Sequence, residues 1–137
     1  MSADAVSISD AAAIAIHTAA MLANQKDGVA STKTMAEALH VSQAHLAKVM
    51  QRLVKSGLVK SIRGPQGGFS LAKDPASTTL LEVYEAIEGS FTPRECLFRH
   101  KVCKHGCVMK DLVDGINGEV RSKFAGTTLT ELVSTQK

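Results

Sequence analysis

Three cysteines stand close together in the second half of the chain, and they are all the cysteines it contains. They are Cys96, Cys103 and Cys107, which gives the spacing C-x6-C-x3-C. A thiolate is a soft anionic ligand that suits iron–sulfur clusters, and it is also the form of cysteine that oxidants attack. Four side chains between the cysteines favour the thiolate when positively charged: Arg99, His100, Lys101 and Lys104. The segment therefore predicts metal binding or redox chemistry rather than a structural disulfide.

Three interpretations of this cysteine segment are open from the residues alone. The first is an iron–sulfur cluster of the two-iron or four-iron type, with His100, His105 or an exogenous group as fourth ligand. The second is a thiol switch without a cofactor, in which Cys103 and Cys107, or Cys96 and a partner, form a reversible disulfide. The third is a loop whose cysteines no longer sense anything.

A helix followed by a hairpin is predicted over residues 42–73. Ser42 is a good N-cap for a helix of about fifteen residues, and Gly57 tolerates the left-handed conformation that ends one. Five apolar residues recur at helical spacing and are expected to be buried: Leu46, Val49, Met50, Leu53 and Val54. The opposite face carries small, amide and basic groups without a carboxylate: Gln43, Ala44, His45, Ala47, Lys48, Gln51, Arg52 and Lys55. Such a face suits DNA.

Strands are expected over residues 58–62 and 69–71, and the tip between them reads Arg63, Gly64, Pro65, Gln66, Gly67, Gly68. Upstream, Thr34 and Glu37 have the spacing of a capping box that opens a short helix through Leu39. Short helix, turn, polar-faced helix and basic hairpin are typical of a winged helix-turn-helix. Residues 33–73 carry a net charge of +6 and the rest of the chain −3, which favours DNA binding through this unit.

Other helices are predicted on both sides of this unit. The first runs from a cap at Ser7 or Ser9 to about Asn24, and another opens at Thr79 and stops at Gly89. From Cys107 onward, an apolar stripe marks a long helix that is a natural dimer seam: Met109, Leu112, Val113, Ile116, Val120 and Phe124. The predicted fold class is mainly α with a small β-hairpin wing and a long C-terminal dimerisation helix.

The predicted helix is followed by the sequence GLVKSIRGPQGGFSLAKDP. This combination resembles the Rrf2 family of bacterial transcription regulators, whose wing carries a similar R-G-P-x-G-G-Y/F signature. The resemblance covers nearly the whole chain. It implies one domain over residues 1–137, with the DNA-binding part in 7–73 and the linker helix, cysteine loop and dimerisation helix in 79–137. Family members are generally homodimers that bind partly palindromic operators in double-stranded DNA, and several sense iron–sulfur status, nitric oxide, cysteine supply or oxidants.

The resemblance also bears on the cysteine segment. Rrf2 cluster sensors carry three cysteine ligands in this loop, spaced more like C-x5-C-x5-C, so the spacing here departs from the pattern. In some family members the first helix lends a cluster ligand to the opposite subunit. His17 lies near the matching place and is therefore a further candidate ligand. The alternative is that His17 is a core or interface residue whose imidazole forms one hydrogen bond.

The DNA contacts are expected to divide by groove. Ser42, Gln43, Ala44, His45 and Lys48 begin the helix that enters the major groove, where amide, imidazole and ammonium groups can reach base edges or nearby phosphates. Three further cations are expected on phosphates: Arg52, Lys55 and Lys60. Minor-groove reading is expected from the wing: Arg63 with the backbone of Gly64, Gly67 and Gly68.

Several other classes of protein are disfavoured. The chain has no apolar run near the roughly 20 residues of a membrane span and no signal-peptide pattern, so we expect a cytoplasmic protein that does not enter membranes. It shows no phosphate loop or paired carboxylates, so we do not expect an enzyme. A protein-interaction adaptor built on the winged helix is the remaining alternative, and salt-insensitive binding would distinguish it.

Overall fold

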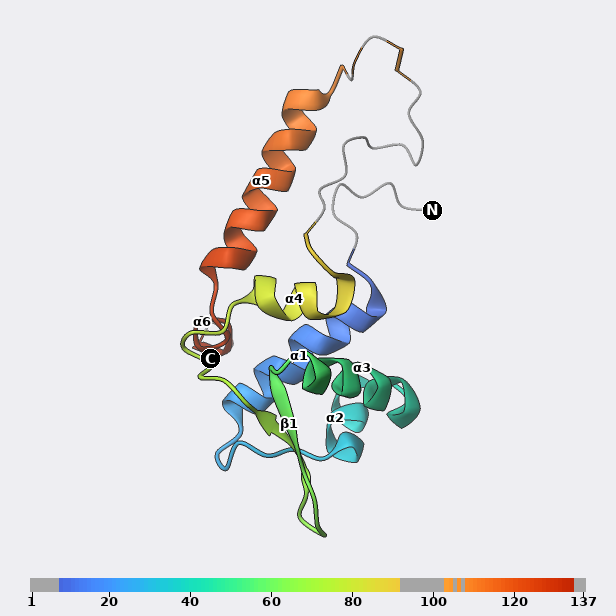
Figure 1. The fold of residues 1–137 in the computed structure, drawn as a ribbon, viewed down its shortest axis with the longest axis vertical. Coiled ribbons are helices and arrows are strands. Elements are labelled where there is room, and N and C mark those ends of the chain that lie inside the picture. The colour runs from blue at the N-terminus through green and yellow to red at the C-terminus, as the bar shows by residue number, and fades with distance from the viewer. Residues whose placement is uncertain (1–7, 92–102, 105, 107, 135–137) are drawn as a thin grey trace.

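The computed structural model describes residues 8–91, 103, 104, 106 and 108–134, which form six helices and a two-stranded antiparallel sheet (Figure 1). The elements are α1 (Asp10–Asn24), α2 (Thr32–Leu39), α3 (Gln43–Lys55), β1 (Val59–Ile62), β2 (Gly68–Leu71), α4 (Leu80–Glu88), α5 (Lys110–Gly126) and α6 (Leu129–Ser134). This architecture confirms the predicted fold class of helices with a hairpin wing. No helix among the described residues is long and apolar enough to cross a membrane.

Helix α1 lies at the centre of the core. Ser9 is its N-cap, and the Ser9 hydroxyl accepts a hydrogen bond from the Ala12 amide at 3.1 Å. Its buried residues lie on more than one side of the helix: Ala12, Ile14, Ala15, Thr18, Ala19, Ala20 and Leu22. Helices α3, α4 and α6 all pack against it, so α1 connects the helix-turn-helix to the C-terminal half.

Helix α2 begins earlier than the sequence predicted. Its N-cap is Ser31, whose hydroxyl accepts from the Thr34 amide at 3.1 Å, so the predicted capping box at Thr34 and Glu37 is wrong. The Thr34 hydroxyl instead accepts a hydrogen bond from the Ser31 hydroxyl at 2.9 Å. His40 ends the helix in the left-handed conformation with φ 55°, which turns the chain sharply into α3.

Helix α3 has the predicted caps but is shorter than predicted. The Ser42 hydroxyl accepts from the His45 amide at 3.1 Å, and the helix then runs for 13 residues. After it, Gly57 (φ +83°) donates to the Val54 carbonyl and Leu58 to the Leu53 carbonyl, which is the Schellman pattern of helix ends. Four apolar residues of the predicted stripe are buried: Leu46, Val49, Met50 and Leu53. Val54 is 37% exposed, so its predicted burial is wrong: it lies at the edge of the buried face in the last turn.

The wing is shaped by backbone contacts at its base. Val59 pairs with Leu71 and Ile62 with Gly68, and Ala30 forms a further bridge to Phe69 on the outer edge of β2. Two glycines lie where no side chain fits. A Cβ on Gly67 would lie 2.1 Å from the Ile62 carbonyl oxygen, and a Cβ on Gly68 2.3 Å from that of Ala30.

Replacing Gly68 by Ala is therefore expected to separate Ala30 from the outer edge of β2. The colliding Ala30 oxygen is a backbone atom that cannot move without breaking the bridge to Phe69, so we expect a stability loss of about 2–4 kcal/mol in chemical denaturation. Gly64 is the matched control, because it has a positive φ of +114° but open space around its Cβ position. Gly64→Ala is expected to cost only about 1–2 kcal/mol. Equal losses would contradict the steric account.

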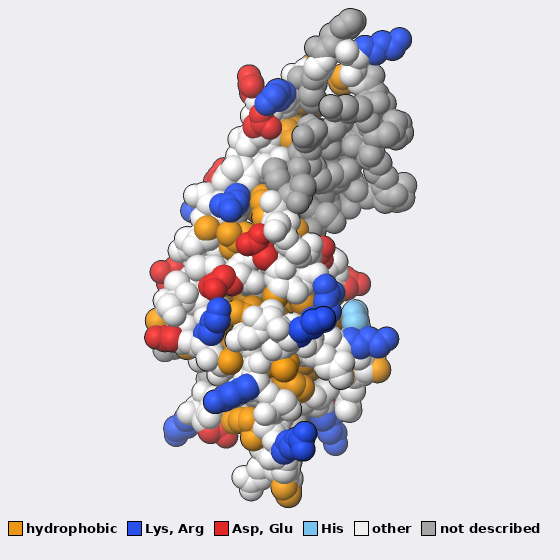
Figure 2. Space-filling model, in the orientation of Figure 1, with side chains coloured by type: hydrophobic (Ala, Val, Ile, Leu, Met, Phe, Trp, Pro, Cys, Tyr) orange, Lys and Arg blue, Asp and Glu red, His pale blue; other side chains and the backbone are white. Residues whose placement is uncertain are grey.

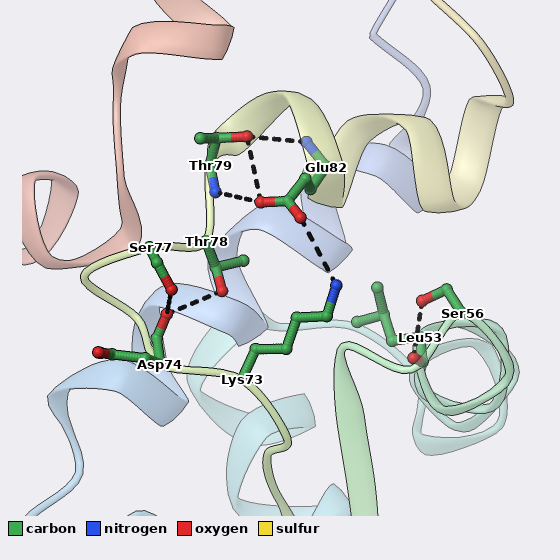
Figure 3. A network of polar contacts seen from close by, with 8 residues as sticks. All are labelled: Leu53, Ser56, Lys73, Asp74, Ser77, Thr78, Thr79 and Glu82. Atoms are coloured by element: carbon green, nitrogen blue, oxygen red, sulfur yellow. Dashed lines mark hydrogen bonds and ion pairs between the residues drawn. The ribbon is translucent and has the colours of Figure 1, made fainter.

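A polar network fastens the end of the wing to the C-terminal half (Figure 3). The predicted capping box at Thr79 and Glu82 is confirmed, and the second Glu82 oxygen lies 3.6 Å from Lys73 Nζ, just beyond β2. Thr78 Oγ1 donates to the Asp74 carbonyl at 2.9 Å. The backbone between α5 and α6 pairs with the same stretch, because Thr79 bridges to Thr128. The wing, α4 and the end of α5 therefore meet at one junction.

Helix α5 rises away from the body in Figure 1, and the C-terminal end of α5 packs against α4. It begins at Lys110, and Cys107, where the long helix was expected to start, lies outside the described residues. Tyr84 of α4 packs against Phe124 of α5 with ring centroids 5.6 Å apart, and against Phe91 at 5.8 Å. These ring contacts join α5 and Phe91 to the middle of α4.

Candidate nucleic-acid interface and cysteine segment

The predicted base-reading residues lie together on the exposed N-terminal end of α3. Gln43, Ala44 and His45 are exposed in its first turn, and Lys48 follows one turn later on the same open surface. Ser42 is exposed beside them, and its oxygen is already used to cap the helix. Because Leu46, Val49 and Met50 hold the opposite face in the core, this end is rigid and presents only small, amide and basic groups.

The wing presents a second exposed surface. Residues 63–66 are all exposed, and Arg63 leaves β1 directly after Ile62. Gly67 and Gly68 lie behind the tip, where Gly67 approaches the Ile62 carbonyl oxygen and Gly68 that of Ala30. Figure 2 shows Lys and Arg side chains gathered around the lower half of the molecule, over the wing and the helices beside it. In a winged helix-turn-helix, a helix of this kind enters one groove of DNA and a basic loop reaches the adjacent groove.

The three cations expected on phosphates do not have equivalent surroundings. All three are exposed, Arg52 and Lys55 in the last turns of α3 and Lys60 on β1. Arg52 differs, because its Nη2 donates a hydrogen bond to the carbonyl oxygen of Ile87 near the end of α4. Sequence reasoning missed this contact, since nothing near Arg52 in the sequence indicates a partner 35 positions away.

The end of α4 carries further contacts that the sequence did not reveal. A Glu85 carboxylate oxygen accepts from the Phe91 amide at 2.7 Å, and Ser9 Oγ donates to the Glu88 carboxylate. Burial raises the pKa of Tyr84, and the negative charges of Glu88 and Glu85 raise it further, so its phenol is neutral at physiological pH. The described chain stops at Phe91 and resumes at Cys103. Phe91, five positions before Cys96, is thus held against α4.

Of the candidate metal ligands, the structure describes Cys103, which is exposed, and His17. The others lie outside the described residues: Cys96, Cys107, His100 and His105. His17 is exposed on α1, with its Nδ1 2.7 Å from the Ala13 carbonyl oxygen, and it lines an open cavity of about 290 Å³ together with His45. The described ranges bring no three His, Cys, Asp or Glu side chains together as a metal site.

Comparison with known proteins gives a consistent picture. The chain matches the sequence model of the Rrf2 family, described as an iron-dependent transcriptional regulator, over residues 8–135. It is 32% identical over 108 residues to the HTH-type transcriptional regulator CymR of Bacillus subtilis, covering 79% of this chain and 75% of that protein. It is 31% identical over 119 residues to the HTH-type transcriptional regulator IscR of Photorhabdus laumondii, covering 83% and 70%. The solved structure of B. subtilis CymR, described as its global cysteine regulator, has a TM-score of 0.78 at 28% identity, covering 95% and 98%.

These relatives are transcriptional regulators and not enzymes, in agreement with the sequence. The family match spans nearly the whole chain, and the fold agrees with a solved regulator over the helices and the wing. The chain belongs to the Rrf2 family of winged helix-turn-helix transcription regulators.

Proposed function

We propose that this protein is a homodimeric, sequence-specific repressor that acts on double-stranded DNA in the cytoplasm. The observation that carries the proposal is the surface formed by α3 and the wing. Helix α3 exposes a face with no carboxylate, and Arg63 is exposed on the adjacent tip. Lys48, Lys55 and Lys60 surround this surface and supply the positive charge that DNA phosphates require.

The contacts follow from the position of each side chain. Gln43 and His45 face base edges in the major groove, where Gln pairs with adenine and His with guanine. Arg63 enters a narrow A·T-rich minor groove, whose potential attracts a guanidinium. Binding to random-sequence duplex should therefore weaken steeply with salt, with a slope of about −0.9 for each neutralised phosphate. Binding that does not change with salt would support a protein-interaction adaptor instead.

We further propose that the cysteine segment controls DNA binding through an iron–sulfur cluster. Three thiols within a short segment form a donor set that fits such a cluster, and the family is described as iron-dependent. His17, His100 or His105 would supply a fourth ligand, with His17 coming from the second subunit. The exposure of Cys103 supports accessibility to iron or to an oxidant. A cofactor-free thiol switch is the second candidate, favoured by the departure of the cysteine spacing from the cluster sensors.

Anaerobic purification should distinguish the two candidates. The wild-type protein is expected to be brown, with iron and sulfide in equal amounts, and replacing Cys96, Cys103 or Cys107 by Ser should remove most of the visible absorption. Replacing Ser90 by Ala, just before the segment, is the control and should leave the spectrum intact. A colourless wild-type protein that forms a reversible disulfide under peroxide would establish the thiol switch instead.

A further inference from the structure

Arg52 occupies an unusual position for a basic residue on a DNA-reading helix. It lies in the last turns of α3, where its charge alone would assign it to a phosphate. Its Nη2, however, donates to the carbonyl oxygen of Ile87, the penultimate residue of α4. The last carbonyls of a helix lack partners within the helix, and a guanidinium is a suitable donor because it is charged and planar.

The carbonyl that Arg52 holds belongs to a well-anchored end. Within the same turn, Gly89 donates to the Glu85 carbonyl at 2.9 Å and ends α4 with φ +79°. The Phe91 amide is held by the Glu85 side chain, and the Phe91 ring packs on Tyr84. Arg52 therefore joins the recognition helix to the place where Phe91 is fixed.

We propose that Arg52 is a positioning residue, which sets the orientation of α3 against the end of α4 instead of neutralising a phosphate. This inference rests on the proposed DNA-binding function and assigns the phosphate role on α3 to Lys48 and Lys55. It makes the end of α4 a control point for DNA binding, because any displacement there moves the carbonyl to which α3 is tied.

The salt dependence of DNA binding separates the two roles. We compare Arg52→Met with Lys55→Met, because each removes one positive charge from the same helix. On random-sequence duplex, Lys55→Met removes one phosphate contact from each subunit of the dimer and should reduce the steepness of log affinity against log salt by about 1.8, while Arg52→Met should leave it unchanged. On a duplex selected from a random-sequence library, Arg52→Met should weaken binding at every salt concentration. A reduction in steepness of about 1.8 for Arg52→Met, or unchanged affinity on the selected duplex, would overturn the proposal.

A double-mutant cycle tests the connection to α4. Phe91→Ala should weaken binding to the selected duplex in the wild-type background and have little further effect when combined with Arg52→Met. Combined with Lys55→Met, its effect should add. Additivity with both variants would count against Arg52 as the link.

Hydrogen exchange on the free protein provides a measurement that needs no DNA. Arg52→Met should accelerate exchange of the Gly89 and Phe91 amides relative to wild type, whereas Lys55→Met should not. Unchanged exchange in Arg52→Met would contradict the proposal even if the protein binds DNA as proposed. Accelerated exchange in Arg52→Met, combined with a wild-type protein that binds no DNA, would instead refute the function and leave the contact established.

Discussion

Replacing Arg63 by Ala is expected to remove specific operator binding. Arg63 is exposed where β1 leaves for the wing tip, and the backbone of Gly67 lies close against the Ile62 carbonyl oxygen across the hairpin. A contact that reads sequence contributes about 1–3 kcal/mol, and a dimer loses two of them. Affinity for a selected duplex should therefore fall roughly 30-fold to 10⁴-fold. A gel-shift titration at moderate salt measures this loss.

Two variants on the same wing serve as controls for Arg63→Ala. Gln66→Ala removes an exposed uncharged side chain from the tip and should leave affinity nearly unchanged. Lys60→Ala should weaken selected and random duplexes to the same extent, because a phosphate contact carries no sequence information. Unaltered affinity in Arg63→Ala, or a loss equal on both duplexes, would refute minor-groove reading by this residue.

The features that the sequence predicted well depend on residues close together in the chain. The Ser42 cap, the Gly57 helix end and the Thr79 to Glu82 capping box each involve groups within about one helical turn. The same locality explains the error at α2. Ser31 and Thr34 are both good caps, and sequence spacing alone does not decide between two competing hydroxyls so near each other.

The features that the sequence missed depend on where distant elements pack. Val54 continues the apolar spacing of α3 yet is exposed, because no element covers that edge of the last turn among the described residues. In the sequence Arg52 is one more cation on a basic face, whereas in the fold α4 places the Ile87 carbonyl against it. The candidate DNA surface was predictable because it consists of what the core leaves uncovered. The contact between Arg52 and α4 was not, because it depends on the packing of two helices.

Helix α5 presents apolar side chains that are exposed among the residues that the structure describes. Leu112 is 54% exposed and Ile116 38%, and Met109 precedes them on the same side of the helix, whereas Val113 is buried. Residues at this spacing form one stripe along a helix. An equivalent stripe on a second copy is its natural cover, since a twofold interface pairs the same patch on both subunits. The proposed dimer therefore uses this stripe.

Replacing Leu112 by Glu should separate such a dimer. Each subunit loses a leucine whose burial contributes about 1.5–3 kcal/mol, and two like charges then meet across the twofold axis. We expect the dimerisation constant to fall by at least about 10²-fold and the selected palindromic duplex to be bound weakly. Ser122→Glu is the matched control, because it adds the same charge on an exposed position away from the stripe. Analytical ultracentrifugation measures both variants, and a Leu112→Glu protein that sediments like wild type would show that the stripe has another role.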